Sequence, residues 1–285
     1  MNNNIKLVEC PRDAMQGWKT FIPTETKIEY LNSLLQVGFD TIDFGSFVSP
    51  KAIPQLADTH AVLKKLDLSG TQTKLLAIVA NMRGAEEAVQ YNQITYLGFP
   101  LSVSETFQQR NTNASIKDAL IRITEIQALC VKSSKTLVVY ISMGFGNPYG
   151  DVYNAEIVFD YVNKLVKEGV QIISLADTVG VATPQQVGEI TEFLVNAVPQ
   201  IEIGVHLHSS AQQWREKVDA AYTAGCRRFD GALKGIGGCP MAHDDLVGNM
   251  NTEWLLHYLR EKGEALTLNN AALEKSLQLA EQIFV

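Results

Sequence analysis

Two histidines in one short apolar segment are the strongest candidates in this sequence for holding a metal ion. His206 and His208 lie in the segment 203–208, where isoleucine, valine and leucine predict a buried strand. Because side chains alternate along a strand, both imidazoles are expected to point to the same face. Two imidazoles at the end of a strand can share one metal ion, and a pair of hydrogen-bonded histidines is the alternative.

An acid and an amide elsewhere in the chain can complete such a site. Asp13 follows the first predicted strand, and Asn249 lies in the loop after the eighth. Two imidazole nitrogens with a carboxylate and an amide oxygen suit an octahedral divalent ion better than a closed tetrahedral zinc. In the alternative interpretation Asp13 and Asn249 cap a turn or a helix, and residue types alone leave both interpretations open.

Charged side chains beside these candidate ligands indicate chemistry on a carbonyl compound. Arg12 precedes Asp13, and a fixed guanidinium next to a metal can stabilise an oxyanion or an enolate. Alternatively, Arg12 forms a buried ion pair with Asp43 or Asp177, and the two roles are compatible. Asp43 and Asp177 end the second and sixth predicted strands. Because an unpaired buried charge is costly, we expect both carboxylates to serve the site rather than to fill the core.

A glycine-rich segment after the eighth predicted strand carries a thiol. Gly235, Gly237 and Gly238 come shortly before Cys239, which predicts a loop able to close over a ligand. The thiol could then donate or accept a proton, and a glycine-rich turn with an incidental cysteine is the alternative. The remaining cysteines lie in or beside apolar segments without any C-x-x-C pattern, so we expect reduced thiols: Cys10, Cys130 and Cys226.

The elements that must position these residues follow a regular alternation. Segments with apolar residues at helical spacing separate short, almost continuously apolar runs that are typical of parallel strands covered on both faces. Helices are predicted over 25–37, 116–131, 155–167 and 212–224, with glycines 38, 169, 225 and 263 where a helix would end. Strands are predicted over 5–9, 41–44, 74–80, 94–99, 137–142, 171–176, 202–208 and 228–233.

Eight strand–helix units predict an α/β fold, a (β/α)₈ TIM barrel, with one additional C-terminal helix over 270–284. An open doubly wound sheet would call for a glycine fingerprint after the first strand, and residues 10–13 do not provide one. No linker interrupts the 285 residues, so we expect a single catalytic domain over 1–285. The barrel brings the ends of all eight strands to one face, where the candidate residues would meet.

Composition excludes several classes of protein. The net charge is −7 and lysine and arginine do not cluster, which argues against binding to nucleic acid. No apolar run reaches the length of about 18 residues that crosses a bilayer, so we expect no membrane segment. Since no signal or transit segment is recognisable, we expect a cytoplasmic protein.

With these residues and elements, the chain resembles the 3-hydroxy-3-methylglutaryl-CoA (HMG-CoA) lyase family. This family belongs to a superfamily of metal-dependent lyases and synthases built on the TIM barrel. The resemblance extends over nearly the whole chain. The run Ser-Phe-Val-Ser-Pro-Lys and the cysteine of the glycine loop favour the lyase over its relatives. The matching segments are 11–13, 46–51, 104–107, 177–180, 206–208, 237–240 and 248–249 with 252–253.

The resemblance implies a reaction and a role for each candidate residue. A Mg²⁺ or Mn²⁺ ion would be held by Asp13, His206, His208 and Asn249. Cleavage of the C2–C3 bond of HMG-CoA would give acetoacetate and acetyl-CoA, a step of leucine degradation. The implied partner is a small acyl-CoA molecule, and a homo-oligomer, a dimer or a tetramer, is expected. The other implied residues are catalytic Arg12, Cys239, Asp43 and Asp177, with Gln16 and Ser46 contacting the substrate.

Some positions depart from the family pattern, and other functions stay open. Asp43 stands where the family usually has glutamate, Ser209 where an aspartate is common, and Ala14 where a glycine is usual. The segment between Cys239 and Asn249 is also one residue longer than the corresponding segment of the family pattern. These changes surround the substrate entrance more than the metal ligands. The alternatives are a Claisen-type synthase, a 4-hydroxy-2-oxo-acid aldolase, and a non-catalytic metal-binding barrel.

Overall fold

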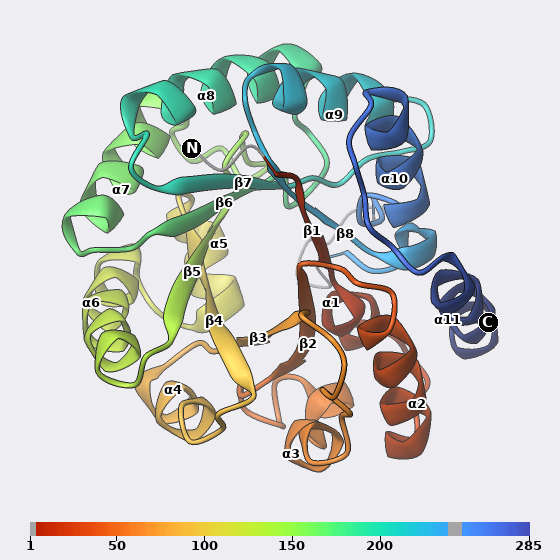
Figure 1. Cartoon of the computed structure of the whole chain (residues 1–285). Helices are drawn as coiled ribbons and strands as arrows, with labels where there is room; N and C mark the ends of the chain where they lie inside the picture. The colour runs from red at the N-terminus through yellow and green to blue at the C-terminus, as the bar shows by residue number, and fades with distance from the viewer. Residues whose placement is uncertain (1–3, 239–246) are drawn as a thin grey trace.

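Eight parallel strands form a closed barrel in the computed structural model, which describes residues 4–238 and 247–285 (Figure 1). Each strand pairs with its neighbour in sequence, and β1 closes the barrel on β8 through pairs such as Leu7 with Phe229. The strands are β1 Lys6–Glu9, β2 Thr41–Ser46, β3 Lys74–Ile78, β4 Ile94–Ser102, β5 Thr136–Ser142, β6 Ile172–Ala176, β7 Glu202–His206 and β8 Arg228–Gly231.

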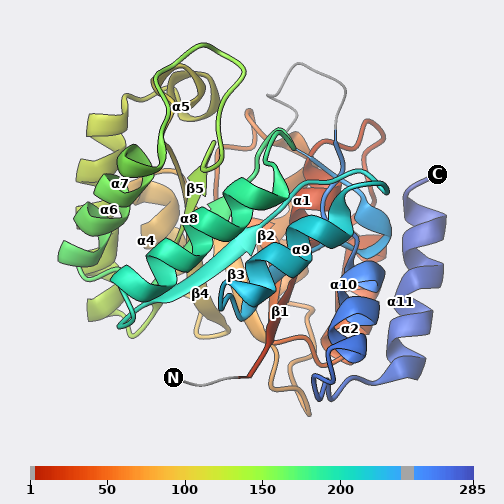
Figure 2. The ribbon, with the colours of Figure 1, turned by 90° about the horizontal axis from the view of Figure 1, so that it is seen from above.

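Helices surround the barrel, and the loops that follow the carboxyl ends of the strands lie at the top of Figure 2. Among the described residues, the short 3₁₀ helices η1 Pro54–Leu56 and η2 Leu233–Gly235 follow β2 and β8. The α-helices are α1 Pro11–Gln16, α2 Thr24–Leu35, α3 Thr59–Leu63, α4 Met82–Ala88, α5 Glu105–Thr112, α6 Ile116–Lys132, α7 Ala155–Lys167, α8 Pro184–Ala197, α9 Trp214–Thr223, α10 Thr252–Glu261 and α11 Asn270–Ile283.

The main hydrophobic core fills the layer between barrel and helices, where strand residues such as Leu97 and Val139 are fully buried. A smaller apolar cluster packs separately and includes Leu76, Tyr96 and Val138 from β3, β4 and β5. Side chains that alternate in direction along each strand produce these two layers. The strands are therefore buried on both faces, which is why their sequences read as continuous apolar runs.

Local sequence explains where the helices begin and end. Thr183 and Gln186 form a reciprocal capping box at the start of α8, with Pro184 in its first turn. After α2, Gly38 has φ +93° and accepts the left-handed conformation that ends a helix at low cost. Glycines 169, 225 and 263 adopt positive φ in the same way after α7, α9 and α10.

The predicted architecture is confirmed, with small differences at element ends. All eight strands form, and β7 ends at His206 instead of His208, so the second histidine lies just beyond the strand. The additional C-terminal helix, α11, packs against α2, where the hydroxyls of Ser33 and Ser276 lie 2.7 Å apart. Within the described residues no helix combines the length and apolarity needed to span a membrane.

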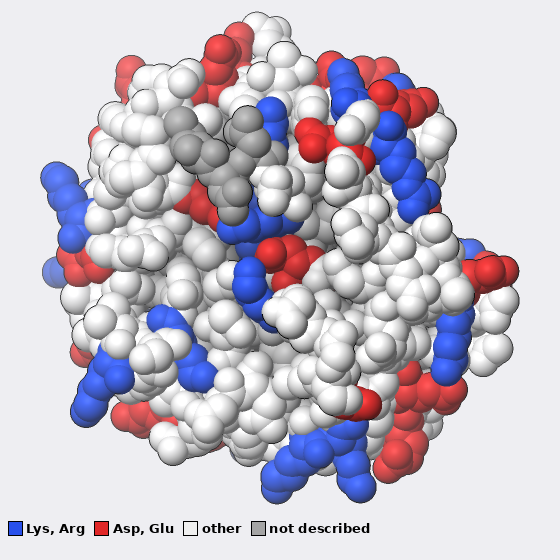
Figure 3. All heavy atoms as spheres, viewed as in Figure 1, with Lys and Arg blue, Asp and Glu red and all other residues white. Residues whose placement is uncertain are grey.

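The face at the amino ends of the strands carries intermixed charges. Figure 3 views the molecule from this side, and acidic and basic side chains lie together near its centre. Ion pairs join the strand starts here: Lys6 with Glu202, and Lys74 with Asp40. The charges of this face therefore pair with one another, and the candidate residues lie at the opposite end of the barrel.

Candidate metal centre and active site

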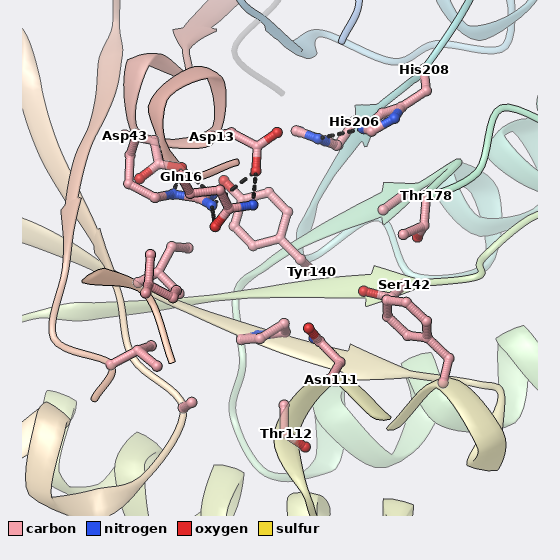
Figure 4. A pocket seen from close by; sticks show the side chains of 18 residues that line it. Asp13, Gln16, Asp43, Asn111, Thr112, Tyr140, Ser142, Thr178, His206 and His208 are labelled. Atoms are coloured by element: carbon pink, nitrogen blue, oxygen red, sulfur yellow. Dashed lines mark hydrogen bonds and ion pairs between the residues drawn. The ribbon is translucent and has the colours of Figure 1, made fainter. Parts of the chain in front are cut away.

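A cavity of about 150 Å³ opens at the carboxyl ends of the strands. Arg12, Asp13 and Gln16 reach it from α1, which begins directly after β1 because Pro11 starts the helix there. His206 and His208 come from the end of β7 and the loop behind it. In Figure 4 these two groups lie on neighbouring sides of one cavity, as the strand-end argument predicts.

The hydrogen bonds of the two histidines determine which nitrogens can bind a metal. His208 Nδ1 lies 3.1 Å from the carbonyl oxygen of Val247, and His206 Nδ1 lies 3.2 Å from the carboxylate of Asp230. Because these oxygens accept, each neutral imidazole carries its proton on Nδ1 and keeps a lone pair on Nε2. The two Nε2 atoms face each other at 3.3 Å, so two lone pairs converge on one point.

Asp13 lies beside these nitrogens, and Asn249 contacts Asp13. Ligand atoms of Asp13, His206 and His208 all lie within 4.8 Å of one another. The amide nitrogen of Asn249 donates to Asp13 Oδ2 at 2.8 Å and to the carbonyl of Ile236 at 2.9 Å, which leaves its oxygen as the acceptor. This buried Oδ1 has no partner among the described residues. The four side chains thus fit a divalent cation that prefers mixed nitrogen and oxygen ligands.

A second group, Cys10, His206 and Asp230, also meets the geometric condition for holding an ion. Burial raises the pKa of the Cys10 thiol well above its ordinary value, and nearby carboxylates raise it further. A thiol binds metals as the thiolate, which this environment disfavours. The set of Asp13, His206 and His208 is therefore the better candidate.

Electrostatics favour the metal-binding forms of Asp13 and His208, whereas they favour proton uptake by His206. Burial raises the pKa of Asp13, but the Arg12 charge and the histidines outweigh burial and bring the pKa to about 2. Burial and the neighbouring His206 lower the pKa of His208 to about 4, which keeps that imidazole neutral. Burial lowers the pKa of His206, but the hydrogen bond and charge of Asp230 outweigh it and raise that pKa.

Arg12 links the candidate metal ligands to the carboxylate of Asp43. Its Nε and Nη2 donate to one oxygen of Asp43 at 2.9 Å and 2.5 Å, and Nη1 donates to Asp13 and to Gln16, both at 2.9 Å. Burial lowers the pKa of Arg12, but the charges of Asp43 and Asp13 outweigh it and raise the pKa. Burial also raises the pKa of Asp43 to about 6, against the opposing effect of Arg12. Both roles predicted for Arg12 are therefore geometrically compatible, with Asp43 as the ion-pair partner.

Two further predicted residues lie behind the cavity wall. Asp177 is buried after β6, where Oδ2 accepts from Lys217 at 2.8 Å and Oδ1 accepts from the backbone of Ala182 at 3.0 Å. Ser46 is also buried, and its hydroxyl accepts from the backbone N–H of Val48 at 3.1 Å. Neither residue lines the cavity, so their predicted roles in catalysis and substrate binding stay predictions.

Cys239, the predicted proton-transfer residue, lies outside the described residues. Gly237 and Gly238 precede it, with φ +106° and +129°. A Cβ at Gly237 would lie 2.5 Å from the amide nitrogen of Asn249, so the backbone passes directly over this candidate ligand. Val247, the next described residue after Gly238, has a carbonyl oxygen that faces His208.

Sequence reasoning missed several residues in and around the cavity. Asp230, which orients His206 from behind the lining, stands in the fully buried last strand, where a carboxylate is a recognisable signal. The others give no comparable signal, because serine, threonine and asparagine occur throughout the chain. In Figure 4, Asn111 and Thr112 of α5 face the cavity on the side away from the histidines. The remaining polar residues of the lining are Tyr140, Ser142 and Thr178.

Fold and site together define a class of protein: a TIM barrel with a candidate divalent-metal centre at the carboxyl ends of its strands. The chain belongs to the HMGL-like family, whose sequence model matches residues 4–283. This family assignment agrees with the resemblance inferred from the motifs.

Several similar proteins are named HMG-CoA lyases. The mitochondrial hydroxymethylglutaryl-CoA lyase of Mus musculus is 33% identical over 283 residues, which are 98% of this chain and 84% of the relative. A hydroxymethylglutaryl-CoA lyase of Bacillus subtilis is 34% identical over 273 residues, covering 96% and 89%. An HMG-CoA lyase from Acinetobacter baumannii, solved with coenzyme A and 3-methylmalate, superimposes with a TM-score of 0.91 at 32% identity and covers 99% of this chain and 92% of that chain.

Proposed function

We propose that this protein is a divalent-metal-dependent HMG-CoA lyase that cleaves its substrate to acetoacetate and acetyl-CoA. The observation that carries the proposal is the convergence of two imidazole lone pairs with Asp13 and Asn249 beside the guanidinium of Arg12. Family membership and the lyases named among its relatives support the same reaction.

A metal centre of this kind matches the reaction. Asp13, His206, His208 and Asn249 would hold Mg²⁺ or Mn²⁺. The bound ion would supply Lewis acidity to the hydroxyl and carboxylate oxygens of the substrate. Loss of the hydroxyl proton to a base lets the C2–C3 bond break, and its electron pair forms the enolate of the acetyl thioester. A proton added to the enolate carbon completes acetyl-CoA.

The chain's own residues orient and stabilise this change. Arg12 is held by Asp43 and lies against Asp13, so its charge is fixed beside the point where the enolate oxygen would develop. Gln16 lines the cavity next to Arg12 and is our candidate for contacting the acyl group. Ser46 is the second candidate, although it is buried outside the lining. Cys239 is the proposed proton donor to the enolate carbon.

The wider context of the protein is also part of the proposal. Its substrate would be a small acyl-CoA, and a structure of an HMG-CoA lyase containing coenzyme A supports this class of ligand. We further propose a cytoplasmic homo-oligomer, a dimer or a tetramer, that acts in leucine degradation. Relatives are named for both mitochondrial and cytoplasmic locations.

A coupled assay for acetoacetate formed from HMG-CoA tests the proposal. Chelator-treated protein should be inactive, and Mg²⁺ or Mn²⁺ should restore turnover. His206→Ala should weaken metal binding by about tenfold or more, while the barrel still folds. Turnover that persists after metal removal, verified by elemental analysis, would show that the metal centre is wrongly assigned. Cleavage of a 4-hydroxy-2-oxo acid, or condensation with acetyl-CoA, in place of HMG-CoA cleavage would favour the alternative functions.

A further inference from the structure

Lys217 is a fully buried lysine on the core side of α9. The helix also buries Val218 and Ala221, so the lysine occupies a position where an apolar residue is usual. A buried ammonium needs partners, because taking it out of water without them is strongly unfavourable. Its partners connect two strand ends of the active-site face.

The ammonium group has three hydrogens and three acceptors. Lys217 Nζ lies 2.8 Å from Asp177 Oδ2, 3.1 Å from the carbonyl oxygen of His208 and 3.2 Å from that of Gly180. All three donors of the group are thereby used. The contacts join α9 to the turn after β6 and to the backbone of a candidate metal ligand.

A second series of contacts leads from Lys217 to the side chain of His208. A Cβ at Gly180 would lie 3.0 Å from three side-chain atoms of Val247, so Gly180 and Val247 pack closely. The carbonyl of Val247 accepts the Nδ1 proton of His208. Lys217 therefore holds His208 at its backbone, and through Gly180 it supports the residue that orients the imidazole.

We propose that Lys217 is a positioning residue of the metal centre, which directs the Nε2 lone pair of His208 toward Asp13 and His206. The proposal deepens the proposed function and rests on it. Asp177 belongs to the same arrangement: both its oxygens are occupied, so it acts by neutralising and fixing Lys217. Partners that orient a metal-bound histidine commonly affect metal affinity by about 10–100-fold.

Mn²⁺ binding, measured by titration and by the electron paramagnetic resonance signal of the free ion, tests this role. Lys217→Met keeps the length of the side chain and removes its three hydrogen bonds. We expect its dissociation constant for Mn²⁺ to rise about tenfold or more. Because Asp177 is left as an unpaired buried charge, the variant should also unfold at a lower temperature.

A double variant separates positioning from stability. Asp177→Asn combined with Lys217→Met removes the unpaired charge but does not restore the contact to His208. The unfolding temperature should recover toward wild type while Mn²⁺ affinity stays about tenfold weak or weaker. If Mn²⁺ affinity recovers together with stability, Lys217 is only the charge partner of Asp177 and the proposal is wrong.

Two further variants complete the experiment. Gly180→Ala retains Lys217 and Asp177 but pushes on Val247, so it should weaken Mn²⁺ binding, and unchanged affinity would contradict the path through Val247. Arg215→Met, on the exposed side of the same helix, is the matched control and should bind Mn²⁺ like the wild type. Absence of Mn²⁺ binding by the wild-type protein would instead overturn the metal centre, and with it the proposed function.

Discussion

The proton positions of the two histidines determine what the candidate site can bind. Their spacing of two residues predicted a shared face, and the facing Nε2 atoms confirm it. The sequence did not indicate that Asp230 and the carbonyl of Val247 would take the two Nδ1 protons. These partners come from other strands and loops, and only the closed barrel brings them to the imidazoles. The sequence could therefore indicate which candidate ligands converge, but not which groups orient them.

A substitution at Arg12 tests the role of this single side chain. Arg12→Lys keeps the positive charge but loses the planar guanidinium, which donates hydrogen bonds to both Asp43 and Asp13. Because these hydrogen bonds fix the positive charge beside the position of the enolate oxygen, we expect kcat to fall by about 10²-fold or more. Mn²⁺ affinity should change little, since the positive charge that keeps Asp13 ionised is retained. Steady-state kinetics with a parallel Mn²⁺ titration measure both quantities, and a near-normal kcat would make Arg12 a structural ion-pair partner only.

Strands β7 and β8 show how the barrel accommodates a buried charged residue, Arg228. Gly204 pairs with Arg228 across the two strands, and a Cβ at Gly204 would lie 2.9 Å from Cδ of the arginine. The buried guanidinium reaches Glu202 at 3.2 Å and lies over the ring of Tyr96. The apolar pattern predicted both strands correctly. It could not predict that the glycine makes room for the arginine, because register between strands does not appear in a sequence.

Gly204→Ala should therefore destabilise the barrel. The new methyl group meets the stem of Arg228, and overpacking of this kind costs about 1–3 kcal/mol. Urea denaturation measures the change in the free energy of unfolding. Gly188→Ala in α8 is the matched control: its Cβ would lie 3.6 Å from that of Ala220 in α9, an ordinary van der Waals contact between the two helices. That variant should gain up to about 1 kcal/mol from helix propensity. Equal effects of the two substitutions would contradict the packing argument.

For the whole molecule, alternation of apolar runs and helical segments was sufficient to predict the barrel. The reason is physical: a strand buried on both faces must be apolar throughout, and a covering helix must be apolar on one side. The polar contacts that close the chain on itself were not predicted. Glu9, at the end of β1, accepts from the backbone of Leu233 at 2.8 Å and from Thr252 at 2.6 Å. It thereby joins the first strand to the last strand–helix unit, two regions more than 200 residues apart.

This carboxyl should make stability depend on pH. Burial raises the pKa of Glu9 from 4.5 to about 8, against the lowering effect of its hydrogen bonds. Between these two values the folded protein retains a proton that the unfolded chain releases. The free energy of unfolding therefore falls as pH rises through this window, by up to about 1.4 kcal/mol per pH unit from this group.

Glu9→Gln removes that dependence and preserves the contacts. The amide oxygen can accept from Leu233 while the amide nitrogen donates to the hydroxyl of Thr252. The stability of the variant relative to wild type should rise by about 1–3 kcal/mol between pH 5 and pH 8, measured by urea denaturation at each pH. Glu192→Gln, on the exposed face of α8, is the control and should show no such trend. A constant difference between Glu9→Gln and wild type would mean that Glu9 is already ionised in the folded barrel at pH 5.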